Sequence, residues 1–375
     1  MVALFDGGLA LNQGWPGNSR SYEIGGVLNI TASEKLLSIC IPTFDRSSLL
    51  ARSLQSVLDD EFPWDTVEVV VLDNASRDDT GRVVERVLSR NSHVRYVRND
   101  FNAGHDRNTL KAIEVAVGDY VFLFSDDDVL VPGSAAEILT AIETVRPSFL
   151  YLNHAGFWED ESPNVVISRQ AELHAENQVY KSGFKFLYDW LLEHASAMVF
   201  RTSVARHALR RMGEYEQFKF ERGYAASALA YQVALEATGP FVKVGHCCVA
   251  VRNPLQPSYN PIYSSHIDPV RQFEVLFSWG LLTRTQFSRL MKKRIWGFRD
   301  NLILALRCAG DPRYSAIERR IIWKQNWRYW RFYLYLAPVV TLPRWIVCPV
   351  YRLGQWVLRR YERFRKVRRR VFDNA

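Results

Sequence analysis

Three consecutive carboxylates, Asp126, Asp127 and Asp128, follow an apolar segment at 120–124 after a single serine, Ser125. Adjacent carboxylates repel one another, so a folded protein keeps such a run where it lies in solvent, caps a helix or shares a cation. Hard oxygen ligands at the carboxyl end of a strand suit Mg²⁺ or Mn²⁺ carrying a diphosphate. The alternative is a solvated turn that caps a helix opening near Pro132. The residue types alone leave both possibilities open.

The acidic run belongs to a stretch, 36–152, in which short apolar segments alternate with helical patterns. Strands are expected at 36–41, 67–72, 94–97, the segment ending in the acidic run, and 149–152. Helices are expected between them, the first with its leucines and valines at 49–58 on one face. This alternation predicts an α/β fold with a mostly parallel, right-handed, doubly wound sheet. Polar clusters follow each strand and should therefore meet at one edge of the sheet.

Composition sets further limits on the kind of protein. With 375 residues, of which 48% are hydrophobic, the chain can bury one large core or two ordinary ones. The five cysteines, at positions 40, 247, 248, 308 and 348, fit neither a metal-ligand nor a disulfide spacing. We therefore expect a reducing compartment, with Cys40 a small core residue and Cys247 and Cys248 packing residues rather than a redox pair.

The charge is divided unevenly along the chain. Residues 319–375 hold 15 Lys and Arg against 2 acidic residues, whereas residues 1–318 hold 33 basic and 38 acidic residues. The excess positive charge is therefore a property of the tail, and the body is mildly acidic.

Four regions are expected. Residues 1–34 are rich in Gly, Asn and Ser and have neither a basic start nor an export-length apolar stretch, which predicts a loose extension on a cytoplasmic protein. Residues 35–152 should form one half of an α/β domain and 153–260 the second half of the same domain. Residues 261–375 should form a helical, basic C-terminal region.

The motifs of the first half, in this order and spacing, resemble family-2 glycosyltransferases of the A-type fold, especially bacterial transferases that extend surface polysaccharides. They are SICIPTFDR at 38–46, VVLDNAS at 70–76 with DT at 79–80, NAG at 102–104 with RN at 107–108, and GDYVFLFSDDD at 118–128. The resemblance covers residues 36–150 closely and fades by about residue 252. It implies transfer of a hexosyl or deoxyhexosyl group from a nucleotide-diphosphate sugar, assisted by Mg²⁺ or Mn²⁺. It also implies that residues 35–152 are the nucleotide-sugar-binding half of the catalytic domain and residues 153–260 its acceptor-side half.

Two residues depart from the family pattern. Asp45 stands where the family usually has Asn, and Ser125 stands where it usually has Asp. The resemblance then assigns Asp127 to the cation, Asp126 to the ribose or a supporting contact, and Asp128 to orienting the loop. Because the three carboxylates are consecutive, Asp127 and Asp128 can exchange roles, so both are candidate metal ligands.

The remaining donor-binding candidates lie after the first three strands. Asp73 can accept a hydrogen bond from a nucleobase N–H, the role that the resemblance implies, or it can stabilise a turn with Asn74. Pro42 and Thr43 can offer backbone groups to the base, while Asp45 either contacts the donor or caps the next helix. Arg107 can bind phosphate oxygens in a bidentate manner, or it can pair with Asp106 or Asp126.

The catalytic base is expected after the returning strand near 196–201. An inverting transferase needs a carboxylate to accept the proton of the acceptor hydroxyl. The helix start that carries an acidic pair in the family reads Ala225-Ala226-Ser227 here, but three glutamates precede it. Of these, Glu221 and then Glu216 are the candidates, and surface placement is the alternative for both.

The tail at 321–372 interleaves Trp, Tyr and Phe with Arg, and prolines interrupt its apolar run at 332–351. This composition argues against a membrane span and favours a segment in the headgroup layer of an anionic membrane, useful for a lipid-linked or other saccharide acceptor. The alternatives are a basic helix packed on the body, or binding of single-stranded nucleic acid, which the acidic body disfavours.

Three classes of function follow. The first is a glycosyltransferase at the inner face of the cell membrane. The second is a nucleotidyltransferase that makes nucleotide sugars; it should have a Gly-rich phosphate loop after the first strand, and residues 42–46 contain no Gly. The third is a non-catalytic membrane or nucleic-acid adaptor with the aspartates in a surface turn.

Overall fold

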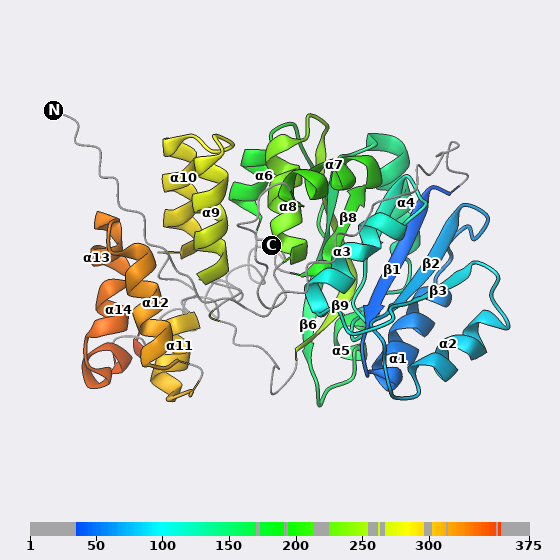
Figure 1. The fold of residues 1–375 in the computed structure, drawn as a ribbon, viewed down its shortest axis with the longest axis horizontal. Coiled ribbons are helices and arrows are strands. Elements are labelled where there is room, and N and C mark those ends of the chain that lie inside the picture. The colour runs from blue at the N-terminus through cyan, green and yellow to red at the C-terminus, as the bar shows by residue number, and fades with distance from the viewer. Residues whose placement is uncertain are drawn as a thin grey trace, which may run out of the picture. The chain divides into compact units, whose positions relative to one another are not determined.

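The computed structural model describes residues 35–169, 173–190, 192, 194–213, 225–253, 262, 267–295, 302–312, 314–349 and 352–353. Residues 35–158 contain the alternating part of the fold (Figure 1). Its elements are β1 (Leu37–Thr43), α1 (Ser47–Leu58), β2 (Val67–Asp73), α2 (Thr80–Leu88), β3 (Val94–Arg98), α3 (His105–Val115), β4 (Tyr120–Leu123), β5 (Val129–Leu130), α4 (Ser134–Val145) and β6 (Phe149–Trp158).

The second part of the domain adds strands to the same sheet and helices to its faces. Its elements are α5 (Asn164–Ile167), β7 (Gln178–Tyr180), α6 (Gly183–Asp189), a 3₁₀ turn (Ala195–Ala197), β8 (Met198–Arg201), α7 (Thr202–Gly213), α8 (Ala225–Glu236) and β9 (Phe241–Asn253). The expected returning strand near 196–201 is thereby confirmed as β8. The short strands β5 and β7 were not anticipated.

The nine strands form one sheet in the order β3-β2-β1-β4-β8-β6-β9-β5, with β7 paired to β9. The pairs among β1, β2, β3 and β4 are parallel. β8 is antiparallel to both β4 and β6, whereas β6 and β9 are parallel. Consequently six strands run in one direction and β5, β7 and β8 run in the other. The expected α/β fold with a mostly parallel sheet is confirmed.

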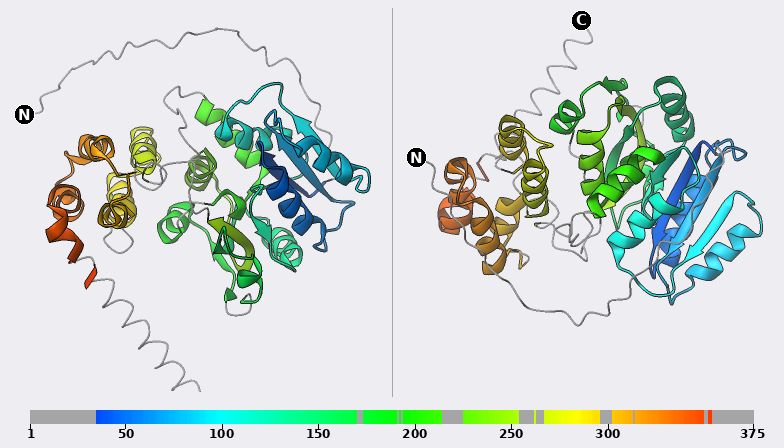
Figure 2. Two further views of the ribbon diagram at one scale, coloured as in Figure 1. Left: turned by 90° about the horizontal axis from the view of Figure 1, so that it is seen from below. Right: turned by 45° about the horizontal axis from the view of Figure 1, so that its top comes forward.

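Helices pack on both faces of this sheet (Figure 2). α1 lies beside α2, and α3 lies beside α7 and α8. The connections between parallel strands place α1 and α2 on the face opposite to α3, since the chain moves outward from β1 to β3 and then returns to β4. Both faces of the parallel strands are therefore covered, which explains why β2 is buried at every position.

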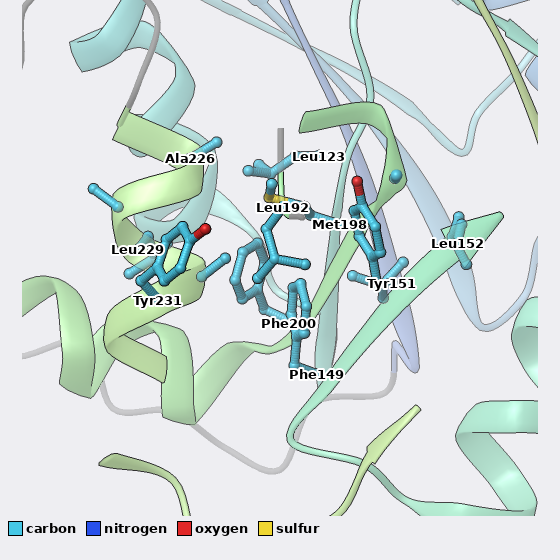
Figure 3. Packing of buried hydrophobic residues seen from close by; sticks show 14 of the residues in the cluster. Leu123, Phe149, Tyr151, Leu152, Leu192, Met198, Phe200, Ala226, Leu229 and Tyr231 are labelled. Atoms are coloured by element: carbon cyan, nitrogen blue, oxygen red, sulfur yellow. The ribbon is translucent and has the colours of Figure 1, made fainter. Parts of the chain in front are cut away.

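The core of the second part is aromatic. Phe149 of β6 and Phe200 of β8 are fully buried with ring centroids 4.8 Å apart, and Figure 3 shows them beside Met198 with Tyr231 of α8 facing the group. Burying each such ring contributes on the order of 2–3 kcal/mol relative to exposure. This packing fixes β8 between β4 and β6.

The C-terminal region is helical. It contains α9 (Asp268–Ser278), α10 (Arg284–Leu290), a π-helical turn (Met291–Ile295), α11 (Leu302–Ala309), α12 (Ala316–Asn326), α13 (Trp330–Tyr335) and α14 (Ala337–Thr341). Local sequence explains where two of these helices begin, because Thr283 with Gln286 and Ser315 with Glu318 form capping boxes. None of the helices in the described ranges is long and apolar enough to cross a membrane.

The cysteines correct one expectation. Cys308 and Cys348 form a disulfide bond across 40 residues, with Cα atoms 5.5 Å apart, so the expectation of no disulfide from the cysteine spacing was wrong for this pair. The other three cysteines are free and buried, as expected for packing residues. Spacing along the chain gave no sign of the bond because helix packing brings the two cysteines together.

Candidate active site

The carboxyl ends of β1, β2 and β4 meet at one edge of the sheet. Thr43 is the register partner of Asp73 across β1 and β2. The Thr43 hydroxyl also donates to Asp126 Oδ2 at 2.7 Å, which connects β1 to the acidic run after β4. Residues far apart in the sequence therefore gather at this edge, as the order of parallel strands predicted.

Asp126 is buried and points into the domain. Its Oδ1 lies 3.1 Å from Arg46 NH1, so the Thr43 hydroxyl and the Arg46 guanidinium occupy both carboxylate oxygens. Burial raises the pKa of Asp126, and the charge of Arg46 opposes this shift. Asp126 thus fixes the loop after β1 against the loop after β4.

Asp127 is the most accessible of the three aspartates, with 18% of its side chain exposed against 6% for Asp126. Two guanidiniums face its Oδ2, Arg46 at 3.4 Å and Arg252 of β9 at 3.3 Å. Arg52 of α1 donates to the Asp127 main-chain carbonyl at 3.2 Å. Three cationic side chains from different elements therefore surround this residue.

Asp128 is buried and faces β9. Its Oδ1 accepts the backbone N–H of Arg252 at 2.8 Å. Burial, followed by the charge of Asp127, raises the pKa of Asp128 to about 8, and a hydrogen bond with Ser196 opposes the shift. Ser196 also accepts the backbone N–H of Ser125 at 2.8 Å. This placement ties the acidic run to the second part of the domain and favours Asp127 over Asp128 as a cation ligand.

Asp73 is fully buried, and its carboxylate already has three donors. Tyr96 donates from its hydroxyl at 2.5 Å, Arg98 NH1 lies at 2.6 Å, and the backbone N–H of Ser76 donates at 2.8 Å. The first two reach the same oxygen, Oδ2. Arg98 is half exposed, with 47% of its side chain accessible, so it is the partner that a ligand can displace.

An asparagine cluster shapes the loop before α3. Asn74 is buried, donates to Asn102 Oδ1 at 2.7 Å, and accepts from Asn99 and from the Ala103 backbone N–H, both at 2.9 Å. Gly104 has φ of +89°, a conformation that favours glycine, and α3 begins directly after it. Arg107 is exposed in the first turn of that helix, so its side chain is accessible to a ligand.

The loop after β1 differs in one detail from the expectation. Asp45 is exposed with φ of +49°, and its Oδ1 accepts the backbone N–H of Arg77 at 2.6 Å. Asp78, not Asp45, accepts the first helical N–H, that of Ser47, at 2.8 Å. The alternative in which Asp45 caps α1 was therefore wrong. Pro42 is half-buried and Thr43 is buried, as befits the end of a strand.

The two candidate bases, Glu216 and Glu221, lie outside the described residues. The helix that follows them does begin near the site, because the backbone N–H of Ala225 approaches Asp106 Oδ1 of α3 at 3.5 Å. The start of α8, which follows both glutamates in the sequence, therefore lies close to the first turn of α3, which carries Arg107.

The acidic run can hold a divalent ion only with help from a ligand. Within the described ranges, no three acidic, His or Cys side chains are grouped to hold a metal. Mg²⁺ and Mn²⁺ commonly bind through one or two carboxylates and complete their shell with substrate phosphates and water. Asp127 fits that donor set, since its carboxylate is partly exposed and stands beside basic groups suited to phosphate.

Comparison with known proteins assigns part of the chain to a family. Residues 38–207, which include β1 to α7 and all three aspartates, match the family model described as Glycosyl transferase family 2. These residues form a family 2 glycosyltransferase domain. The edge described above is the carboxyl edge of that domain's sheet.

Two curated bacterial proteins are similar to this glycosyltransferase domain. Abequosyltransferase RfbV of Salmonella typhimurium is 36% identical over 119 residues, covering 31% of this chain and 35% of that protein. A Campylobacter jejuni enzyme named GalNAc(5)-diNAcBac-PP-undecaprenol beta-1,3-glucosyltransferase is 30% identical over 104 residues, covering 28% and 33%. The chain thus spans about a third of the length of these relatives.

A solved structure supports the fold of the glycosyltransferase domain over a longer stretch. S. aureus TarS 1-349 in complex with UDP-GlcNAc has a TM-score of 0.55 at 16% identity, covering 81% of this chain and 85% of that one. The expected glycosyltransferase A-type fold is therefore confirmed.

Sequence reasoning found the aspartates but missed several of their partners. Arg98 and Arg252 were not anticipated, and Arg46 was noted without a role. Arg46 lies three residues after Thr43 in the motif at 38–46, so its position in the sequence indicated that it belongs to the site. Arg252 is 125 residues away from Asp127 and ends an apolar strand, so no local pattern pointed to it.

Proposed function

We propose that the protein transfers a hexosyl or deoxyhexosyl group from a nucleotide-diphosphate sugar to a saccharide acceptor in surface-polysaccharide synthesis. The observation that carries this proposal is the meeting of Thr43, Asp73, Asp126 and Asp127 at the carboxyl edge of a family 2 domain. Ligands bind at this edge in open α/β sheets. The relatives whose names specify a sugar transfer support the reaction class.

The donor nucleoside would lie over the ends of β1 and β2. Pro42 and Thr43 would offer backbone groups to the base, with Asp45 beside them. Asp73 would accept a base N–H once the half-exposed Arg98 turns away from Oδ2. Displacing one partner keeps the buried carboxylate satisfied, because Tyr96 and Ser76 remain bound.

The diphosphate would lie between α3 and the acidic run. Arg107 would bind phosphate from the first turn of α3, where the helix N-terminus also favours an anion. Asp126 would support the ribose side through Thr43 and Arg46. Asp127 would hold Mg²⁺ or Mn²⁺, and such an ion neutralises the charge that develops on the leaving diphosphate.

The acceptor hydroxyl needs a proton acceptor on the face of the sugar opposite the leaving nucleotide. We assign this role to Glu221 first and Glu216 second. Both precede α8, whose first residue lies near Asp106 of α3. The glycosidic C–O bond would break with its electron pair remaining on the phosphate oxygen, while the acceptor oxygen attacks the anomeric carbon.

Release of nucleoside diphosphate from a panel of nucleotide sugars, with and without Mn²⁺, tests this function. Wild type should turn over at least one donor in the presence of Mn²⁺, and Asp127→Asn should reduce turnover by about 10²–10³-fold. The matched control is Asp65→Asn, an exposed carboxylate on the loop before β2. Equal turnover by wild type and Asp127→Asn, or none with any donor, would favour the adaptor alternative. Pyrophosphate release from a nucleoside triphosphate and a sugar phosphate would instead favour the nucleotidyltransferase.

The acceptor is proposed to be lipid-linked, and the protein to bind the inner face of the cell membrane. Large hydrophobic side chains remain exposed on the C-terminal helices, among them Trp327, Trp330 and Leu334. Arg328 and Arg344 lie on the same helical region and suit anionic headgroups. Two relatives carry undecaprenol diphosphate in their names, which supports an acceptor held in a membrane.

A further inference from the structure

Two arginines from distant parts of the domain form ion pairs with Asp127, the carboxylate suited to a cation. Arg46 follows β1 and Arg252 is the penultimate residue of β9, and each places Nη1 within 3.4 Å of Asp127 Oδ2. Arg252 is held firmly: its side chain is 12% exposed, its NH2 lies 2.5 Å from Glu159, and its backbone N–H donates to Asp128. Arg46 is looser, with 44% of its side chain exposed.

This arrangement conflicts with a divalent ion on Asp127. A cation bound to Oδ2 would stand next to two guanidinium groups, and like charges at such distances repel strongly where water is partly excluded. The arginines and the cation therefore compete for the same oxygen, unless an anion comes between them. A diphosphate is such an anion, and guanidinium binds phosphate oxygens in a bidentate manner.

We propose that Arg46 and Arg252 form an arginine latch, which holds Asp127 before the donor binds and moves to the donor diphosphate when a cation takes the carboxylate. This inference rests on the proposed function and adds two donor-binding residues to it. The latch neutralises Asp127 in the empty site. In the filled site the same guanidiniums stabilise the charge left on the diphosphate when the glycosidic bond breaks.

The latch also makes cation and donor binding depend on each other. The cation alone takes Asp127 from both arginines and, among the described residues, leaves Arg46 only Asp126 and Arg252 only Glu159 as acidic partners, whereas a diphosphate bound with the cation offers both guanidiniums a new anion. Arg252 belongs to β9, and its backbone N–H also binds Asp128 in the acidic run. The coupling between cation and donor binding therefore involves β9 as well. A purely structural ion pair between β9 and the loop would not produce such mutual dependence.

Mn²⁺ binding to the full chain without nucleotide, followed by the electron paramagnetic resonance of free Mn²⁺, tests the first half of the latch. Arg252→Gln and Arg46→Gln should each bind Mn²⁺ about tenfold more tightly than wild type, as expected for loss of one competing cation. Arg252→Lys keeps the charge and should stay close to wild type. The matched control is Arg82→Gln on α2, where the arginine is exposed and pairs with Asp79.

Calorimetry with UDP, GDP, CDP and dTDP in saturating Mn²⁺ tests the second half. For the diphosphate that wild type binds best, Arg252→Gln should lose about tenfold in affinity, and the matching monophosphate should lose clearly less. Unchanged or weaker Mn²⁺ binding in both glutamine variants, or equal losses for diphosphate and monophosphate, would overturn the latch. If Arg252→Gln does not fold, Arg46→Gln decides, since that side chain is half exposed.

Failure of the proposed function would look different. If wild type binds none of the four diphosphates, the transferase proposal fails, yet the Mn²⁺ measurement still shows whether the arginines compete with a cation for Asp127.

Discussion

The sheet domain and the C-terminal helices differ in the environment of their polar and aromatic side chains. In the domain, buried carboxylates have fixed partners: Glu68 binds Ser38 and Arg95, and Asp73 binds Tyr96 and Arg98. In the C-terminal helices, Trp330 and Trp345 are largely exposed, at 67% and 76%, although Trp323 packs against Phe332.

This difference indicates which kind of partner each region is suited to bind. A buried charge persists only with partners already in position, so the domain's site is preset for a small, charged ligand. An exposed tryptophan gains its favourable energy only when another surface covers it, so the C-terminal helices are suited to a large apolar or interfacial partner. The following variants test this contrast, beginning with the largest expected effect.

Asp73→Ala should be the most damaging change to the domain. It leaves the Arg98, Tyr96 and Ser76 donors without their acceptor, and we expect a loss of about 3 kcal/mol in the free energy of unfolding. Urea denaturation followed by circular dichroism measures the loss. The control is Asp79→Ala, whose carboxylate is 70% exposed and pairs only along α2 with Arg82 among the described residues. That change should stay within about 0.5 kcal/mol, and equal effects for both would contradict the contrast.

Lys243 is a buried lysine whose effect on the stability of the folded protein depends on pH. It lies in β9 at 4% exposure, with Nζ 4.8 Å from the Tyr151 ring centroid and 5.2 Å from that of Trp190. Burial lowers the pKa of Lys243 to about 7. Between pH 7 and its ordinary value the unfolded chain holds the proton and the folded chain does not, so wild-type stability rises with pH across that window.

Lys243→Met should therefore raise Tm by roughly 5 °C at pH 6, where wild type carries the full cost of the buried charge. The advantage should shrink through pH 7–10 and vanish above it. Thermal melting of both proteins across this range measures the effect, with Lys181→Met as the exposed control. An advantage that is independent of pH would mean that packing, not charge, dominates at this site.

Trp330→Ser and Trp345→Ser should change membrane binding while leaving folding intact. Each should weaken flotation with vesicles containing anionic lipid by roughly threefold to tenfold, with Tm within about 1 °C of wild type. Trp158→Ser removes a tryptophan of similar exposure, 53%, from the sheet domain and should leave flotation unchanged. Equal losses for all three variants, or none for any, would remove the proposed role of the C-terminal helices.

Much of the sheet could be predicted because its signals are local. β1, β2, β4 and β6 are apolar runs followed by polar clusters, and parallel order then places Thr43, Asp73 and Asp127 at one edge. β5 and β7 have two and three residues, too few to show a period, and they exist only because β9 offers them a pairing edge.

The contacts within the site were less predictable for the same reason. Thr43 with Asp126 and Arg252 with Asp127 are tertiary pairings, and each residue alone looks like an ordinary strand end. The assignment of Asp128 also needed coordinates, because only β9 reveals that this carboxylate serves a backbone N–H. Likewise, Cys308 meets Cys348 through helix packing that spacing cannot show.

The position of β8 limits how this enzyme scaffold could be re-engineered. β8 begins after residue 197 in the sequence, yet it lies between β4 and β6 in the sheet. Replacing only residues 35–152 with a homologous segment would therefore put new strands on both sides of the original β8. A chimera meant to change donor preference should therefore carry β8 and its phenylalanine with the incoming piece.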